Sequence, residues 1–261
     1  MRIKNLILSA AVLLSSILLI SCESNDNPVL QSNNSTANSK ALMEFFTAVN
    51  CPNCPPPGYF LDKIDSLKGV TINDTNVIII RYHSNFNGYD PYYLYNPAPS
   101  AARHSYYQYF WNPAGSLMGT SMPSYDQTAW LNTINTQLER RNPIETGITN
   151  TFDTTTRNGT VSVSLLQTST TPVSDLKLFI AVTESELYYT GTNGEKYHQN
   201  TFRDFYTANT GDDVSLTPGA LLNVSKNYTL NTAINFRNSH IVVFVQSASA
   251  KTVYGVERIK F

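Results

Sequence analysis

The chain has few cysteines and little charge, and both shortages exclude functions. It has three cysteines in 261 residues, and its four histidines show no paired spacing, so a closed zinc site lacks half of its ligands. Lysine and arginine total 18 against 19 acidic residues, with no basic run among them. We therefore expect no nucleic-acid partner, no metal and no other cofactor.

Long hydrophobic runs are also missing, apart from the stretch Leu6 to Ile20, which is too short and ends too sharply for a transmembrane helix. It follows the basic residues of Met1–Lys4, as the core of a signal peptide does. It ends in Leu-Ile-Ser-Cys at Cys22, which resembles the bacterial lipobox; an ordinary signal peptide that happens to contain a cysteine is the alternative. We predict a signal peptide at 1–21 and acylation of Cys22, with palmitate, as a firm lipid anchor in a membrane.

Residues 22–40 are rich in asparagine and serine and contain almost no apolar side chains. Such a segment cannot bury enough surface to fold, so we predict a disordered tether between the lipid and the folded part.

The central motif is Cys51-Pro-Asn-Cys54, which stands between a predicted strand at Leu42 to Phe46 and a helical pattern from Gly58 to Leu67. At a helix N-terminus a thiolate meets free backbone N–H groups, which lower its pKa. We predict Cys51 as the exposed attacking sulfur and Cys54 as the resolving one. Half of a zinc site and a purely structural disulfide are the alternatives, but a bridge across two residues constrains the unfolded chain little.

A thioredoxin-like order of elements continues to Pro143. A buried strand is predicted at Thr75 to His83, then an aromatic loop, a helix at 100–109, a strand led by proline, and a helix that begins with a capping box of Ser124 and Gln127. In this fold a cis-proline faces the cysteines. Pro113 is the candidate, with Pro123 as the competing position and a trans turn proline as the alternative.

Beyond residue 143 the pattern contains only strands. Alternating residues such as Val161 and Val163, separated by turn signals, predict a β-sandwich over 144–261. The strands are expected at 148–152, 159–166, 176–183, 228–234, 240–246 and 252–257. Tyr197 to Thr210, with His198, Arg203 and Asp204, is interpreted as a solvated connection, with a metal or catalytic role of His198 as the alternative.

These features together resemble the outer membrane protein twenty-eight family of Gram-negative lipoproteins. The shared features are the lipobox, Glu-Phe-Phe-Thr at 44–47 before Cys-x-x-Cys-Pro, Arg-Tyr-His at 81–83 and Tyr-Tyr at 106–107 before the proline-led strand. The resemblance implies an α/β thioredoxin-like N-terminal domain at 41–143 and an all-β immunoglobulin-like sandwich at 144–261. It also implies an envelope lipoprotein at the outer membrane. Thioredoxin-like proteins usually have a buried acid that assists the second cysteine, and Glu44 is the nearest carboxylate in this sequence.

Two function classes follow. In the first, Cys51, Cys54 and Pro113 form the site of a thiol–disulfide oxidoreductase that acts on thiols or disulfides of exported proteins. In the second, the thioredoxin-like core is a scaffold for a binding lipoprotein. There the aromatic loop 86–95, with Tyr106, Tyr107 and Trp111, contacts peptides or glycans, although packing is the commoner reason for such aromatics.

Overall fold

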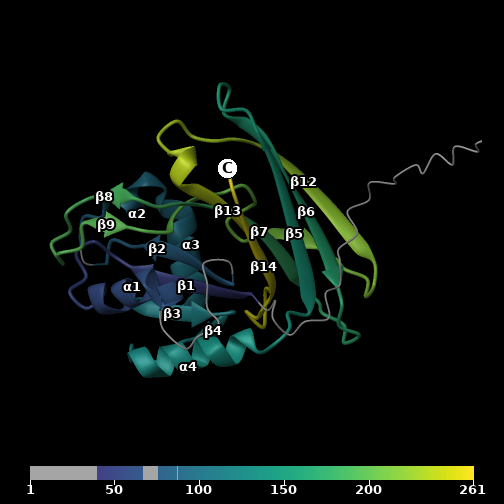
Figure 1. Cartoon of the computed structure of the whole chain (residues 1–261), viewed down its shortest axis with the longest axis horizontal. Helices are drawn as coiled ribbons and strands as arrows, with labels where there is room; N and C mark the ends of the chain where they lie inside the picture. The colour runs from purple at the N-terminus through teal and green to yellow at the C-terminus, as the bar shows by residue number, and fades with distance from the viewer. Residues whose placement is uncertain (1–39, 67–75, 87) are drawn as a thin grey trace, which may run out of the picture. The chain divides into compact units, whose positions relative to one another are not determined.

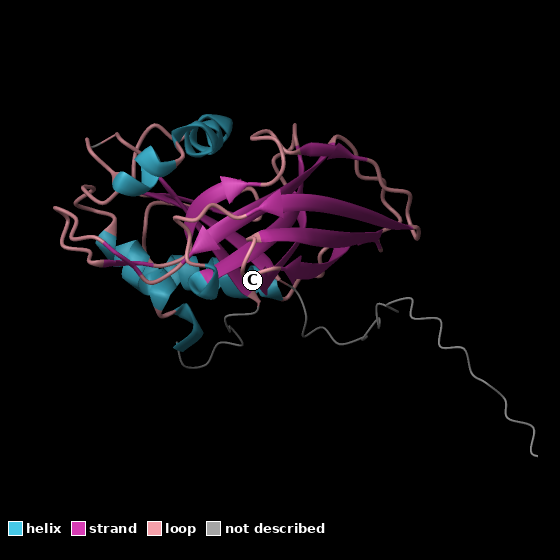
Figure 2. Ribbon diagram, turned by 90° about the horizontal axis from the view of Figure 1, so that it is seen from above, coloured by secondary structure: helices cyan, strands magenta, loops and turns pink. Residues whose placement is uncertain are grey.

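The computed structural model describes residues 40–66, 76–86 and 88–261; the predicted signal peptide, Cys22 and the tether up to Ser39 lie outside them. The described residues are mostly strands with few helices (Figures 1 and 2). In chain order the elements are β1 (Ala41–Thr47), α1 (Pro55–Asp62), η2 (Ile64–Ser66), β2 (Val77–His83), α2 (Pro91–Tyr95), α3 (Pro97–Tyr107), β3 (Ala114–Leu117), β4 (Thr120–Ser121), α4 (Gln127–Leu138), β5 (Ile144–Phe152), β6 (Asn158–Gln167), β7 (Leu176–Glu184), β8 (Leu187–Tyr188), β9 (Tyr197–His198), β10 (Thr201–Phe205), β11 (Asp212–Val214), β12 (Leu221–Thr229), η3 (Phe236–Asn238), β13 (Ser239–Ser247) and β14 (Val253–Lys260).

One large sheet has the strand order β14-β13-β7-β10-β2-β1-β3-β4, with β11 paired to β7 beside it. Strands β1 and β2 are parallel, and β3 runs antiparallel to β1. Strand β10 joins β2 through the parallel pair Thr201↔Arg81, the one registered pair between them in the described chain. A second sheet, β12-β6-β5, lies alongside the β7, β13 and β14 end of the first (Figure 1).

The N-terminal elements follow the predicted order. The apolar runs of β1 and β2 are buried on both faces, as expected of central parallel strands. Helix α1 begins at Pro55, three residues before the predicted start at Gly58. Prolines suit this first turn because its N–H groups have no helical partner and the fixed φ of proline matches the helix.

The other helices also start elsewhere than the sequence analysis predicted, and α3 begins at Pro97 rather than at residue 100. Helix α4 is capped by Asp126, whose side chain accepts a hydrogen bond from Ala129 N at 2.8 Å, and the predicted capping box at Ser124 is wrong. Helix α2 lies inside the segment that was interpreted as a loop. Its cap is Asp90, followed by Pro91 at the first helical position, which is a recognisable helix start.

In the C-terminal half one predicted strand is misplaced, and the short strands β8, β9, β10 and β11 were missed. The strand predicted at 228–234 is the end of β12, which runs from Leu221 to Thr229 and carries polar residues on its open face. The supposed connection from Tyr197 to Thr210 contains β9 and β10. Its polar composition hid both strands; β9 pairs with the nearby β8, whereas β10 is held by β2 and β7.

Strands β7 and β13 supply two separate hydrophobic cores. Phe179 and Phe244 point into the core shared with α1, α3 and α4. Their neighbours Ile180 and Val243 point into the core under β5, β6 and β12. Because side chains alternate across a strand, each of these strands must be apolar along almost its whole length. A fully buried side chain of this kind contributes about 1.5–3 kcal/mol.

The predicted boundary between residues 143 and 144 falls between α4 and β5, yet strands from both sides of it share the large sheet. Whether the two parts fold independently depends on their separate stabilities. The division into two domains therefore stays a prediction for a fragment experiment.

Candidate functional site

The two cysteines of the central motif lie where β1 gives way to α1, and they form a disulfide. Cys54 is the N-cap residue of α1, without a side-chain capping bond. Three backbone bonds build the turn: Cys51 N to Ala48 O at 3.1 Å, Cys54 N to Cys51 O at 3.2 Å and Gly58 N to Cys54 O at 3.0 Å. Both sulfurs thus belong to a tight turn at the open end of a helix.

The expectation of an exposed Cys51 is wrong for this oxidised pair. Cys51 is 1% exposed and Cys54 is fully buried. The cysteines pack with Ala48 in a small apolar cluster, and other segments of the chain hold the turn from two sides. This covering depends on contacts between distant segments, so local sequence reasoning could not find it.

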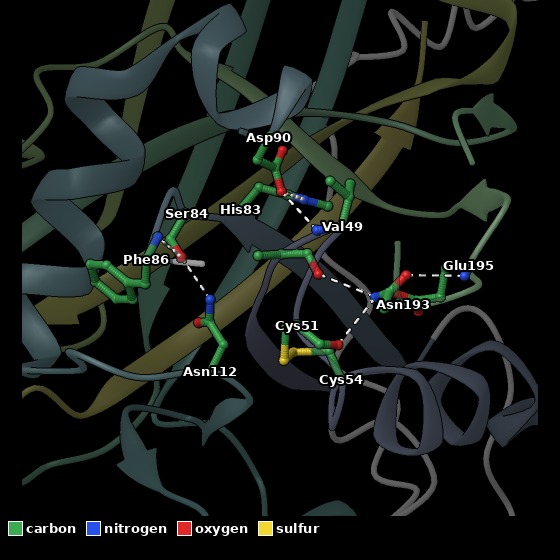
Figure 3. Close-up of a disulfide and its surroundings, with 11 residues drawn as sticks. Val49, Cys51, Cys54, His83, Ser84, Phe86, Asp90, Asn112, Asn193 and Glu195 are labelled. Atoms are coloured by element: carbon green, nitrogen blue, oxygen red, sulfur yellow. Dashed lines mark hydrogen bonds and ion pairs between the residues drawn. A yellow bond between two sulfur atoms is a disulfide. The ribbon is translucent and has the colours of Figure 1, made fainter. Parts of the chain in front are cut away.

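The cis-proline prediction is confirmed in its geometry: the Asn112–Pro113 bond is cis, and the bond before the competing Pro123 is not. Strand β3 begins directly after Pro113, and its pair Phe46↔Ala114 places the proline beside the end of β1. The cysteine turn follows that same end (Figure 3). A role of Pro113 in positioning a substrate remains a prediction.

The buried carboxylate of Asp90 joins several segments by hydrogen bonds beside the cysteine turn, and the sequence analysis did not single it out. Its Oδ2 accepts from Val49 N at 2.9 Å and lies 2.8 Å from Nδ1 of His83 (Figure 3). Its Oδ1 accepts from Tyr92 N. Burial opposes its charge, but His83 and the backbone donors at Val49 and Tyr93 outweigh burial and lower the pKa of Asp90. The Asp90-Pro91 helix start was the available sequence signal.

Glu44, the acid nearest to the cysteines in sequence, has another partner. Arg103 of α3 donates to its carboxylate through Nε at 3.0 Å, and also contacts Gln246 of β13 and Tyr107. The guanidinium is fully buried with this carboxylate. Glu44 therefore belongs to a buried ion pair with Arg103, and the contacts of Arg103 join β1, α3 and β13.

The turn between β8 and β9 covers the other side of the cysteine turn. The side-chain amide of Asn193 donates to the carbonyls of Ala48 and Cys51, each at 3.3 Å (Figure 3). The same amide donates to Glu195 at 2.7 Å. This segment is far away in sequence, so a motif search around the cysteines could not find it.

His198 and Arg203 are buried, so the interpretation of a solvated connection is wrong for them. His198 donates through Nε2 to the Tyr189 carbonyl oxygen at 3.0 Å and packs against Tyr92. Arg203 pairs with Glu184 and lies over the ring of Tyr95 at 3.7 Å. No group of three or more His, Cys, Asp or Glu in the described ranges is placed to hold a metal ion.

The predicted aromatic contact surface divides into core and surface residues. Tyr92 and Tyr107 are buried, whereas Phe86 is 45% exposed and Trp111 58% exposed. Tyr89 is also open to solvent. The exposed rings belong to the loop after β2 and to the segment that leads to Pro113 and β3. Strands β2 and β3 are the two neighbours of β1, and β1 leads into the cysteine turn.

Comparison with known proteins adds the family. The family model described as Outer membrane protein Omp28 matches residues 102–261. The solved structure of HBP35 of Porphyromonas gingivalis is similar with a TM-score of 0.73 at 17% identity, over 85% of this chain and 75% of that one. A domain of the outer membrane lipoprotein Omp28 from the same organism matches with a TM-score of 0.35 at 16% identity, over 46% of this chain and 95% of that one. No curated protein matches significantly.

Proposed function

The chain belongs to the Omp28 family of outer membrane proteins of Gram-negative bacteria, and from this premise we propose that it exchanges thiols and disulfides with exported proteins through Cys51 and Cys54. The observation that carries the proposal is the cysteine pair at the N-terminus of α1, beside the loop of Pro113. We propose Cys22 as the lipid anchor. Among the residues that the structure covers, no helix has the length and apolarity to span a membrane.

A thioredoxin-like fold of the N-terminal part fits the sheet order β2-β1-β3-β4. In this order β1 is parallel to β2, β3 is antiparallel to β1, and β4 is antiparallel to β3. Helices α1 and α4 pack on the face of β1 that bears Phe45, as the ring contacts of Trp130 with Phe45 and Phe60 indicate. Helix α3 packs on the face that bears Phe46. An immunoglobulin-like sandwich of β5–β7 and β11–β14 completes the proposed architecture.

The proposed reaction has two exchange steps. The thiolate of reduced Cys51 attacks one sulfur of a substrate disulfide, which forms a mixed disulfide and releases the first substrate thiolate. The Cys54 thiolate then attacks Cys51 Sγ and releases the second substrate thiolate. The substrate gains two electrons and two protons, and the protein dithiol becomes the Cys51–Cys54 disulfide; the reverse reaction uses the same steps.

The position of the cysteines at the helix start should give the two thiols different pKa values and different reactivities. The positive N-terminal end of the α1 dipole stabilises a thiolate at Cys51, although the three prolines of the first turn have no N–H to donate, whereas Cys54 lies behind it, shielded by these prolines. An ordinary thiol has a pKa of about 8.5, so a decrease by one or two units raises the thiolate fraction at pH 7 about ten- to thirtyfold.

The test uses the mature chain after mild reduction. Cys51 should react with iodoacetamide much faster than Cys54, and a Cys54→Ser variant should trap mixed disulfides with envelope proteins. Cys51→Ser is the matched control and should trap none. Equal alkylation rates together with no trapped partner would refute the exchange reaction.

A binding lipoprotein is the second candidate, and the exposure of Phe86, Tyr89 and Trp111 favours it. Exposed aromatic rings can stack on sugars or on peptide side chains. If a Trp111→Ala variant loses binding to a peptide or glycan array while Cys51→Ser retains it, the binding function is the better account.

A further inference from the structure

The 189–196 turn, which connects β8 to β9, is held against the cysteine turn by backbone and side-chain bonds. Asn193 N donates to Val49 O at 3.4 Å, and its side-chain amide donates to the carbonyls of Ala48 and Cys51. These two carbonyls also accept the turn's own bonds, from Cys51 N and Cys54 N respectively. One side chain thus contacts both ends of the turn that sets the geometry of the cysteine pair.

The Asn193 amide is itself fixed in orientation. Its nitrogen has two hydrogens and three acceptors nearby: Glu195 Oε2 at 2.7 Å, and the Ala48 and Cys51 carbonyls at 3.3 Å each. The shorter bond takes one hydrogen, and the other is shared between the two carbonyls. Its Oδ1 accepts from Glu195 N at 3.0 Å, which excludes the flipped amide (Figure 3).

Two glycines permit the close approach of these segments. A Cβ on Gly191 would lie 2.2 Å from Val49 O, so only glycine brings this part of the turn so near the cysteine segment. A Cβ on Gly58, in the first turn of α1, would lie 2.8 Å from Glu195 Oε1. The buried carboxylate of Glu195 therefore rests directly on the helix that Cys54 begins.

We propose that Asn193 is a positioning residue for the Cys51–Cys54 pair, supplied by the C-terminal half of the chain. This inference rests on the proposed exchange function. By holding the Ala48 and Cys51 carbonyls, Asn193 keeps the turn closed after reduction, so that the Cys51 thiolate stays at the positive N-terminal end of the α1 dipole. Without it the reduced turn loosens, and the thiolate loses part of its stabilisation.

The primary variant is Asn193→Ala, which removes the donors and adds no charge. Asn209→Ala, at an exposed position in the loop after β10, is the matched control. The measurements are the rate of iodoacetamide alkylation of Cys51 against pH, and the equilibrium of the cysteine pair with glutathione. We expect the alkylation rate at pH 7 to fall about three- to tenfold, with a corresponding shift of the pH midpoint upward, and the equilibrium to move toward the disulfide by a similar factor.

Asn193→Gln, which retains both N–H donors, should recover part of the rate and tests for a merely structural loss. If Asn193→Ala does not fold, Asn193→Ser takes its place in the same assays. An unchanged pH midpoint of Cys51 in the folded Asn193→Ala or Asn193→Ser variant overturns the inference. Because alkylation needs no partner protein, this result is separable from the exchange function, which stands or falls with trapping by Cys54→Ser in an otherwise unaltered chain.

Discussion

Replacing His198 by glutamine should change how the stability of the protein depends on pH. His198 is 3% exposed, and its Nε2 lies 3.0 Å from Tyr189 O, where a neutral ring can donate. Burial lowers its pKa from 6.5 to about 4, and the neighbouring charges of His83 and Arg81 act in the same direction. The Tyr189 carbonyl and Asp90 oppose this shift without cancelling it.

The sign follows from proton binding. Between pH 6.5 and about 4 the unfolded chain binds a proton at His198 and the folded chain does not, so stability is lost as the pH falls through this window. The slope is about 1.4 kcal/mol per pH unit, because one pKa unit corresponds to that free energy. Over the whole window the loss amounts to about 3 kcal/mol.

The assay is urea unfolding of the oxidised mature chain at several pH values between 7 and 4, for the natural protein and for His198→Gln. The stability advantage of the natural protein should shrink by about 3 kcal/mol across this range, since glutamine does not titrate. Tyr197→Phe, at the exposed neighbouring position, should show a difference that does not depend on pH. A difference between natural protein and His198→Gln that stays constant within about 1 kcal/mol would refute the assignment of a neutral buried imidazole.

Three further predictions follow. Cys22→Ala should move the protein from the membrane fraction to the soluble fraction, and its retention in the membrane pellet would contradict lipid anchoring. Arg103→Met should destabilise the fold by about 3–5 kcal/mol in urea unfolding, because it leaves Glu44 buried without its cation. Adding Glu44→Gln should recover part of that loss, and additive losses in the double variant would contradict a paired network. A fragment that starts at Ile144 should show a cooperative unfolding transition by circular dichroism. Its stability should be lower than that of the whole chain, because Phe244 loses its core neighbours. A fragment without a cooperative transition would argue against two domains.

The parts of the fold that could be predicted are those written in local periodicity. The apolar runs of β1 and β2 and the turn and helix between them gave the strand–helix–strand unit and the place of Cys51 and Cys54. Pro113 could be chosen over Pro123 because a strand and a glycine follow it. These signals are local because each depends on residues within one or two turns of chain.

The parts that could not be predicted depend on pairing between distant segments. Strand β10 is polar enough to resemble a loop, and only its neighbours β7 and β2 make it a strand. The burial of Cys51 and the contacts of Asn193 have the same origin. For Arg103, the cationic side chain predicts an exposed helix face, and the buried carboxylate of Glu44 reverses that expectation.

The joint between β10 and β2 has a consequence for how the large sheet opens. It consists of the pair Thr201↔Arg81 and the bond from Arg81 N to Asn200 O at 2.9 Å, whereas β7 and β13 are paired along nine positions. Local opening follows the weakest pairing, so amide hydrogens at this joint should exchange with solvent well before those of β7 and β13. Such an opening would loosen the segment that carries the 189–196 turn, because this turn lies just before β9 and β10 in the chain. Access to the cysteine pair would then depend on how often the pairing between β10 and β2 opens, and hydrogen–deuterium exchange can measure the rate of this opening.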